Sequence, residues 1–464
     1  MTQIVRLILL LVFAGVCVRL GDPRSGAGDA VLSISGDIAG EIDICNCSGD
    51  MYGGFPRRVS QLDQLRAEGR PVLAVDLGNA FASSSAQGRL KAEYMYRLYA
   101  RMGYDALNVA ENDLLFGPAY ITEIAQANHL NLISATMAKP GGGGLLFAPY
   151  VVRSVEVNGK TVRIGILGVT GHPNLKTARK ILDSQGVELI PVKDALARVI
   201  PELRAKSDLI VIVGQLNGDE IDALAKEYPD IAAIISGRGN REAGSIESIR
   251  SAPLPGSSID ALHKPEKPVV YFGKSEVKKL TIRADIALDD AGKVSSVAIS
   301  EHLIDPKIPR SPDAEAMLKE YYAKLATIPP PPPIAASDLP ATQRIGYVGS
   351  DKCGECHKAQ YEMWKLSDHA KAITTLANTG QTKDHDCLPC HTTGYLKPSG
   401  FRDVDLTPGM VNVQCEDCHS AGSGHVESPN RGYGRKAILT CRNCHTPERD
   451  TDWNLARCRE KIRH

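Results

Sequence analysis

The stretch Cys415-Glu-Asp-Cys418-His419-Ser-Ala-Gly-Ser-Gly-His425 decides how the C-terminal part of the chain folds. Two cysteines separated by two residues occur in zinc sites, but such sites do not need a histidine directly after the second cysteine. Covalent haem attachment does need this order, because two thiols bond the porphyrin vinyl groups and the adjacent imidazole lies beneath the iron. The spacing therefore favours a c-type haem here.

The same pattern occurs four times between residues 353 and 445. The predicted thioether attachment points use every cysteine of that segment: Cys353, Cys356, Cys387, Cys390, Cys415, Cys418, Cys441 and Cys444. The histidines that follow them are the predicted proximal iron ligands: His357, His391, His419 and His445. Four copies predict four haem c groups, with paired zinc sites or disulfides as the alternative.

Each haem iron has a second axial position. An imidazole there produces a six-coordinate iron suited to electron transfer, whereas an open position admits a substrate. Four further histidines in this part of the chain are candidate distal ligands: His369, His425, His385 and His464. Their number permits a second imidazole for every iron but does not assign the pairs.

Five consecutive prolines, Pro329 to Pro333, separate two parts of different composition. Such a run adopts polyproline II and acts as a stiff spacer. We expect one domain over residues 30–325, a proline-rich linker over 326–344 and a tetrahaem domain over 345–464. Few aliphatic residues follow the linker, so we expect a mainly helical and irregular domain that packs around haem.

The first domain alternates β-branched runs with amphipathic stretches, which predicts an α/β fold. Runs such as PVLAVDLG (71–78) and LIVIVG (209–214) are almost continuously apolar, as expected for strands buried on both faces. The stretch 88–103 has helical periodicity. Asn158-Gly159 lies between two alternating runs and predicts a hairpin.

Residues 345–464 resemble the tetrahaem cytochrome c-554 family. The resemblance is carried by Leu366-Ser-Asp-His369-Ala-Lys-Ala, by Cys387-Leu-Pro-Cys390-His391-Thr-Thr-Gly394-Tyr and by the stretch from Cys415 to His425. It implies that His369 and His425 are distal ligands that reach neighbouring haems rather than their own. It does not assign His385 or His464.

Residues 30–325 resemble the calcineurin-type metallophosphatase domain of the 5′-nucleotidase family, a β-sandwich with flanking helices. The order of SGDIAG, MYGGFPRR, VDLGN, YDALNVAENDLLFG, IVIVGQLNGD and IISGRGN carries this resemblance. That family holds two metal ions with imidazoles and carboxylates. Asp37 keeps a carboxylate of the first motif, but other residues replace the remaining ligands: Ala39, Asn79, Glu111-Asn112, Gln215 and Gly237-Arg238-Gly239-Asn240.

The missing imidazoles predict a retained fold that has lost its hydrolase chemistry, because the remaining donors bind first-row metals poorly. A rebuilt site is the alternative, and Cys45-Asn-Cys47 is its candidate: the two thiols could hold an additional metal ion, form a disulfide or pair with Cys458. A structural pair of small residues is the simpler interpretation. Arg57, Arg58 and Arg238 are candidates for an anion site.

Residues 1–20 place one arginine before an apolar run that is too short to span a bilayer comfortably, which predicts a signal peptide. We therefore expect a periplasmic or extracellular protein, with membrane association through Cys17 as a lesser hypothesis and no membrane span in the mature chain. Equal numbers of basic and acidic residues, 54 each, argue for no nucleic-acid partner.

Together these patterns predict an exported electron carrier rather than an enzyme, with redox proteins as donor and acceptor. The metallophosphatase-like domain would serve as a docking or assembly surface, and the pattern leaves room for a homo-oligomer. Two alternatives remain open at this point. One is a haem-based reductase with an open iron site; the other is a metal-dependent phosphoesterase with a rebuilt site.

Overall fold

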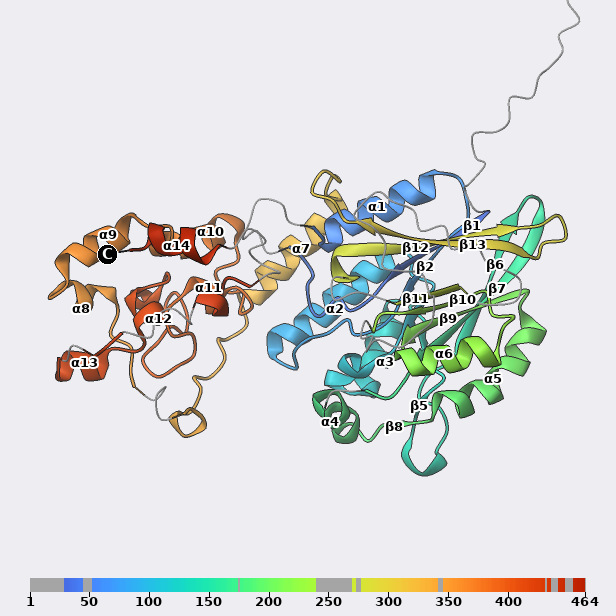
Figure 1. The fold of residues 1–464 in the computed structure, drawn as a ribbon, viewed down its shortest axis with the longest axis horizontal. Helices are drawn as coiled ribbons and strands as arrows, with labels where there is room; N and C mark the ends of the chain where they lie inside the picture. Colours follow the sequence, from blue (N-terminus) through green and yellow to red (C-terminus); the bar gives the residue numbers. More distant parts are fainter. Residues whose placement is uncertain are drawn as a thin grey trace, which may run out of the picture.

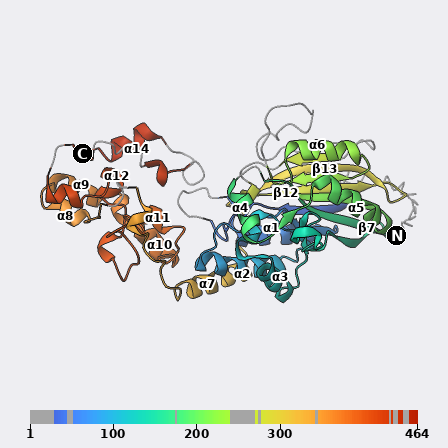
Figure 2. The same ribbon diagram turned by 90° about the horizontal axis from the view of Figure 1, so that it is seen from below.

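The computed structural model describes residues 29–44, 52–173, 176–238, 269–272, 277–340, 345–429, 432–434, 441–446 and 454–463. The described chain forms two parts, with helix α7 (Pro312–Leu325) between them (Figures 1 and 2). The predicted signal segment, Cys45, Cys47 and His464 lie outside the described residues. Within the described part of the chain, no helix has the length and apolar character that crossing a membrane requires.

The N-terminal part is built on two large β-sheets, with strand orders β13-β12-β1-β2-β3-β4 and β11-β10-β9-β7-β6. The first contains β1 (Ala30–Ser35), β2 (Val72–Asp76), β3 (Ala106–Asn108), β4 (Leu132–Ile133), β12 (Leu280–Leu288) and β13 (Val294–Leu303). The second contains β6 (Tyr150–Val157), β7 (Lys160–Thr170), β9 (Leu209–Gln215), β10 (Ala233–Ser236) and β11 (Val269–Phe272). A small third sheet pairs β5 (Met137–Ala138) with β8 (Glu188–Leu189).

Alternation along the strands divides the core into layers. In β1, Leu32 belongs to an apolar cluster shared by both large sheets, whereas its neighbour Val31 belongs to a cluster shared with helices. The helices of that second cluster are α1 (Phe55–Ala67), α2 (Ala86–Arg101), α3 (Pro118–Ala127) and α7. A third cluster joins the sheet of β6, β7, β9, β10 and β11 to α5 (Val192–Lys206) and α6 (Gly218–Glu227). Helix α4 (Lys176–Ser184) contributes Leu182 to the cluster that contains α1, α2, α3 and α7. The result is a two-sheet sandwich with flanking helices, which confirms the predicted fold class (Figure 1).

The predicted hairpin forms between β6 and β7, which pair antiparallel from Tyr150↔Leu167 to Val157↔Lys160. Its two turn residues have positive φ, 51° at Asn158 and 76° at Gly159, as a two-residue turn matched to the strand twist requires. The apolar runs of residues 71–78 and 209–214 form β2 and β9 as predicted. Strands β3 and β4 are short, with three and two residues.

The C-terminal part consists of short helices joined by irregular chain. They are α8 (Ser350–Gly354), α9 (Lys358–Leu366), α10 (Ala372–Thr379), α11 (Leu388–His391), α12 (Cys415–His419), α13 (Ser423–Glu427) and α14 (Leu455–Lys461). Among its described residues, the apolar cluster contains only Leu376, Leu388 and Phe401 as fully buried members. Such a small core is what we expect of a domain whose buried surface comes largely from a cofactor.

The proline run, residues 329–333, has no regular secondary structure. Directly after it, the backbone N–H of Ile334 donates to the carbonyl of Leu396, at 2.8 Å, in the C-terminal part. Before it, the hydroxyl of Tyr322 on α7 accepts a hydrogen bond from Gln381 Nε2, at 2.6 Å. Contacts to the C-terminal part therefore lie on both sides of the run.

Candidate functional site

The predicted attachment motifs coincide with four short helical segments. The first spans α8 and the residues after it, the second and third lie on α11 and α12, and the fourth contains a 3₁₀ turn at Cys441–Asn443. The thiols of Cys353, Cys356, Cys415, Cys418 and Cys441 are free and at least partly exposed. A helical turn over two cysteines and the next histidine places all three side chains on one side of the backbone.

Two of the predicted proximal histidines face a second imidazole. The ring centroids of His357 and His425 lie 6.3 Å apart, and those of His369 and His445 lie 6.2 Å apart. When two imidazoles bind one iron axially, each nitrogen–metal bond is about 2 Å long. Adding the distance from each nitrogen to the centroid of its ring separates the two centroids by about 6 Å. Both pairs are therefore spaced to hold an iron between them, and the residues present fit a haem.

This geometry places the two distal candidates that the resemblance implied beside motifs distant in sequence. His425 follows the third motif but faces the histidine of the first, while His369 follows the first motif and faces the histidine of the fourth. The sequence offered these candidate ligands without their pairing. The fold supplies the pairing because α13 and the turn at His369–Lys371 bring the rings across from other motifs.

The other two motif histidines are oriented through Nδ1. In His391 this atom lies 2.6 Å from the carbonyl oxygen of Ala372, and in His419 it lies 3.3 Å from that of Gly434. A carbonyl partner keeps the proton on Nδ1, so that Nε2 remains a lone-pair donor for a metal. Both rings thus have the tautomer that an iron ligand needs.

His385 lies in the turn before the second motif. Its Nδ1 is 2.7 Å from the hydroxyl of Tyr395, which fixes the orientation of the ring but, unlike a carbonyl, can either donate or accept the hydrogen bond. Burial lowers the pKa of His385 and of His369, which favours the neutral ring that metal ligation requires. The described residues therefore retain His385 as a distal candidate, while His464 stays a prediction.

The first and third motifs are packed against each other. The side-chain oxygen of Gln414 accepts the N–H of Ser350 at 2.5 Å, and the hydroxyl of Ser350 accepts the N–H of Cys415 at 3.1 Å. The thiols of Cys353 and Cys415 are close enough to hydrogen bond. Groups attached to these two cysteines must therefore lie side by side.

In the degenerate metal motifs, the amide side chains of Asn79 and Gln215 lie where the 5′-nucleotidase family is expected to have metal ligands. Asp37 Oδ1 accepts one hydrogen bond from Asn79 Nδ2 at 3.0 Å and another from Gln215 Nε2 at 3.1 Å. Burial raises the pKa of Asp37 to about 6. Both amide NH₂ groups donate to the Asp37 oxygen that would otherwise bind a metal. They therefore compete with a cation for this oxygen and do not bind the cation themselves.

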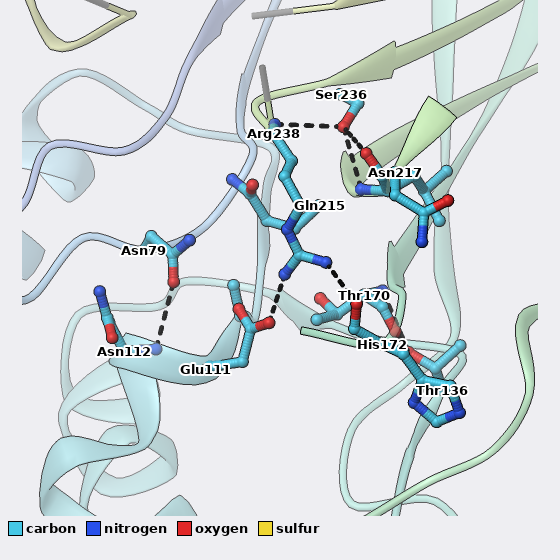
Figure 3. Close-up of polar contacts among 12 residues, drawn as sticks. Asn79, Glu111, Asn112, Thr136, Thr170, His172, Gln215, Asn217, Ser236 and Arg238 are labelled. Carbon is cyan, nitrogen blue, oxygen red and sulfur yellow. Dashed lines mark hydrogen bonds and ion pairs between the residues drawn. The ribbon is translucent and has the colours of Figure 1, made fainter. Parts of the chain in front are cut away.

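Glu111 is neutralised by an arginine. The guanidinium of Arg238 forms an ion pair with the buried Glu111 carboxylate and donates to the carbonyl of His172 at 3.0 Å (Figure 3). Asn112 instead donates its backbone N–H to Asn79 Oδ1 at 3.1 Å (Figure 3). No group of three or more histidine, cysteine, aspartate or glutamate side chains suited to a metal occurs among the described residues.

Arg58 and Arg238, which the sequence suggested for an anion site, bind other groups of the protein. Arg58 is buried and donates to the carbonyls of Leu280 and Lys278, at 3.1 and 2.8 Å. Arg238 is held by Glu111. Both guanidinium groups therefore bind protein acceptors, and the sequence did not reveal these partners because they lie far away along the chain.

Comparison with known proteins supports both resemblances. Residues 352–420 match the family model described as cytochrome c554 and c-prime. The cytochrome c-554 of Nitrosomonas europaea is 33% identical over 91 residues, which cover 16% of this chain and 39% of that protein. A snake venom 5′-nucleotidase of Gloydius brevicauda is 21% identical over 336 residues, which cover 69% of this chain and 55% of that protein.

Among solved structures, a calcineurin-like phosphoesterase of Bacillus subtilis superposes with a TM-score of 0.51 at 19% identity, covering 64% of this chain and 98% of that one. This likeness concerns the fold of the N-terminal part. The chain spans only about two fifths and about half of the length of the two curated relatives. It thus joins a cytochrome c-554-like region to a 5′-nucleotidase-like fold.

Proposed function

We propose that this chain is an exported electron-transfer protein that binds four haem c groups covalently through its eight motif cysteines. The observation that carries the proposal is the spacing of two histidine pairs, 6.3 and 6.2 Å between ring centroids, which involve the histidines of the first and fourth motifs. Haem c supplies a one-electron couple at each iron. A second imidazole leaves no open position at an iron, which suits relay better than substrate turnover.

The protein's own residues would fix the geometry of this relay. Carbonyl partners hold Nδ1 of His391 and His419, so each ring presents Nε2 in one orientation. The contact of Ser350 with Cys415 holds the first and third attachment sites together. Close packing of neighbouring cofactors permits electron exchange along a row, and a redox protein in the same exported compartment would be donor or acceptor.

We also propose that the N-terminal domain has no hydrolase activity and serves as a docking or assembly surface. Two side-chain amides donate hydrogen bonds to Asp37, and Arg238 forms an ion pair with Glu111. To bind a metal, the two carboxylates would first have to release these partners. The 5′-nucleotidase-like fold is what favours the alternative of a phosphoesterase.

The test is a count of covalent haems on the full chain, produced in a host that matures c-type cytochromes. We expect an intact mass increased by four haems, a matching pyridine haemochrome spectrum and loss of one haem from the double variant Cys441→Ala/Cys444→Ala. A chain with the mass of bare polypeptide and no Soret band would refute the proposal.

The two alternatives are measured on the same preparation. Release of phosphate from a nucleotide after addition of manganese or zinc would replace the docking role with a phosphoesterase activity. A high-spin signal in the resting spectrum that shifts on addition of a small ligand such as cyanide would favour a reductase with an open iron site. We expect neither turnover nor a ligand-induced shift.

A further inference from the structure

Helix α2 of the N-terminal part contacts the turn that precedes the second attachment motif. The side chain of Gln87, which is 3% exposed, bonds this turn with both of its polar atoms. Gln87 Nε2 donates to Asp384 Oδ1 at 2.7 Å, and Gln87 Oε1 accepts the backbone N–H of His385 at 2.8 Å. One buried amide thus fixes both the carboxylate and the backbone of the turn.

One helical turn further along α2, Lys91 forms an ion pair with Asp386 and lies close to Asp384. Lys91 is 8% exposed and Asp384 is 5% exposed. A buried ammonium group is stable only beside opposite charge, and here two carboxylates of one turn provide it. The arrangement is therefore a built contact between the two parts of the chain.

The turn is continuous with the second attachment site. The carbonyl of Asp384 accepts the N–H groups of Cys387 and Leu388, at 3.0 and 3.1 Å, so the turn begins the helix that carries Cys390. Lys91 lies within electrostatic range of the Cys387 sulfur. A charge on α2 must therefore act on whatever is bonded to Cys387.

The same helix is anchored to the degenerate metal motifs. The loop after Asp37 and the loop after Asn79 are joined by a hydrogen bond from Gly40 N to Ala80 O, at 2.7 Å. Gly40 and Ser85 line a small pocket together with Lys91 and Asp386. The loop after Asn79 leads into the start of α2, so the degenerate motifs and the contact of Lys91 with Asp386 adjoin the same pocket.

We propose that Gln87 and Lys91 are positioning residues for the haem on Cys387 and Cys390, and that the Lys91 cation raises the reduction potential of that haem. The proposal rests on the proposed function. A positive charge near an iron favours its reduced form, because reduction lowers the charge at the iron by one. Without Lys91, Asp384 and Asp386 would place uncompensated negative charge beside the same group.

The test is a spectroscopic redox titration of the full-length holoprotein. In Lys91→Met, we expect one of the four reduction steps to move to a more negative potential while the other three stay in place. Asp386→Asn should move the same step in the opposite direction, and the double variant should bring it back towards the wild-type value. Lys91→Arg keeps the charge and should keep the potential.

The matched control is Arg89→Met, which removes a cation from an exposed position of the same helix, where the guanidinium packs on Tyr120. It should move no step. For Gln87→Ala, hydrogen exchange at the amides of residues 385–387 should become about tenfold faster, the ratio expected when about 1.4 kcal/mol of local stability is lost. Exchange at residues of α10 should not change.

Four covalent haems with unaltered potentials in both Lys91→Met and Asp386→Asn would overturn this inference and leave the proposed function standing. A uniform shift of all four steps would also overturn it, because it would indicate general unfolding rather than a local charge. A chain without covalent haem would overturn both proposals.

Discussion

Single imidazoles decide the ligation of each iron in the proposed function, and their placement depends on short local segments. His369 begins a 3₁₀ turn after α9, and its ring reaches the histidine of the fourth motif. The centroids of these two rings lie 6.2 Å apart. The loss of this one side chain should therefore change one iron and spare the others.

We expect His369→Ala to convert one of four low-spin irons to a high-spin, five-coordinate form, because the distal ligand is removed and the proximal one remains. Electron paramagnetic resonance and the optical spectrum of the oxidised protein measure this change. His302→Ala, a change on strand β13 of the N-terminal part, is the control and should leave the spectrum as it was. An all-low-spin spectrum in His369→Ala would contradict the assignment.

Asp37 should make the N-terminal domain less stable as the pH rises. Its pKa is raised by burial to about 6 in the folded chain, compared with 3.8 in an unfolded one. Between these values the folded state retains a proton that the unfolded state has released, so the free energy of unfolding falls with rising pH. The loss is complete above about pH 6 and is absent below about pH 4.

We therefore expect Asp37→Asn to be more stable than the wild type by about 2 kcal/mol at pH 7 and equally stable near pH 4. Asparagine also tolerates the positive φ of 49° at this position. Chemical denaturation at several pH values, followed by a signal from the N-terminal part, measures the difference. A difference that does not vary with pH would show that Asp37 has an ordinary pKa.

At the scale of elements, one carboxylate fastens the segment before α8 to α12. Glu416 is 2% exposed and accepts the N–H groups of Val348, Gly349 and Gly422, the last two at 2.8 and 2.7 Å. Three backbone donors from two segments converge on it. The contact keeps the first and third motifs together, and in the proposed function it would also keep their haems together.

Glu416→Gln should destabilise the C-terminal part by about 2 kcal/mol, because an amide NH₂ would face backbone donors and leave at least one of them buried without an acceptor. Hydrogen exchange at Val348 and Gly349 should rise, and thermal unfolding followed at the Soret band should occur at a lower temperature. Glu427→Gln, at an exposed position on α13, is the matched control and should change neither. Unchanged protection at Val348 and Gly349 in Glu416→Gln would contradict this role.

Some secondary-structure elements could be predicted from sequence patterns alone. Strands β2 and β9 and the Asn158-Gly159 hairpin were predictable because their apolar periodicity and turn residues are local properties. The four Cys-x-x-Cys-His patterns are local as well, and the haem attachment that they predict stays a prediction. Partners that depend on the fold were not: the pairing of His425 with His357 joins residues 68 positions apart (425 minus 357).

The contact between Gln87 and the turn at Asp384 was also beyond sequence analysis. A glutamine and a lysine on a helix usually face solvent, and only the position of the second domain turns this face of α2 into a buried one. Likewise, Arg238 was suggested for an anion because its carboxylate partner, Glu111, follows a different strand. Such polar partners have no periodic signal that a single sequence could reveal.

For the whole molecule, the two parts differ in what stabilises them. The N-terminal part contains three large apolar clusters, whereas the described C-terminal residues bury only three large apolar side chains in theirs. Covalent cofactor would replace the missing apolar surface. Folding of the C-terminal part should therefore depend on haem, and folding of the N-terminal part should not.

We expect a chain produced without haem attachment to keep the N-terminal part folded and to lose the C-terminal part to limited proteolysis. Mass spectrometry of the fragments should show a stable product that ends within or after α7. The haem-loaded chain, digested in parallel, is the control and should resist cleavage within residues 345–429. A haem-free chain equally resistant there would contradict the dependence on cofactor.

The hydrogen bonds on either side of the proline run have a mechanical consequence. Because Tyr322 and Ile334 are each tied to the C-terminal part, the five prolines span two fixed points and do not act as a free tether. Extra residues inserted there would bulge outwards into solvent without increasing the separation of the two lobes. The two parts would tumble together, and their separation would not depend on the number of residues in the proline segment.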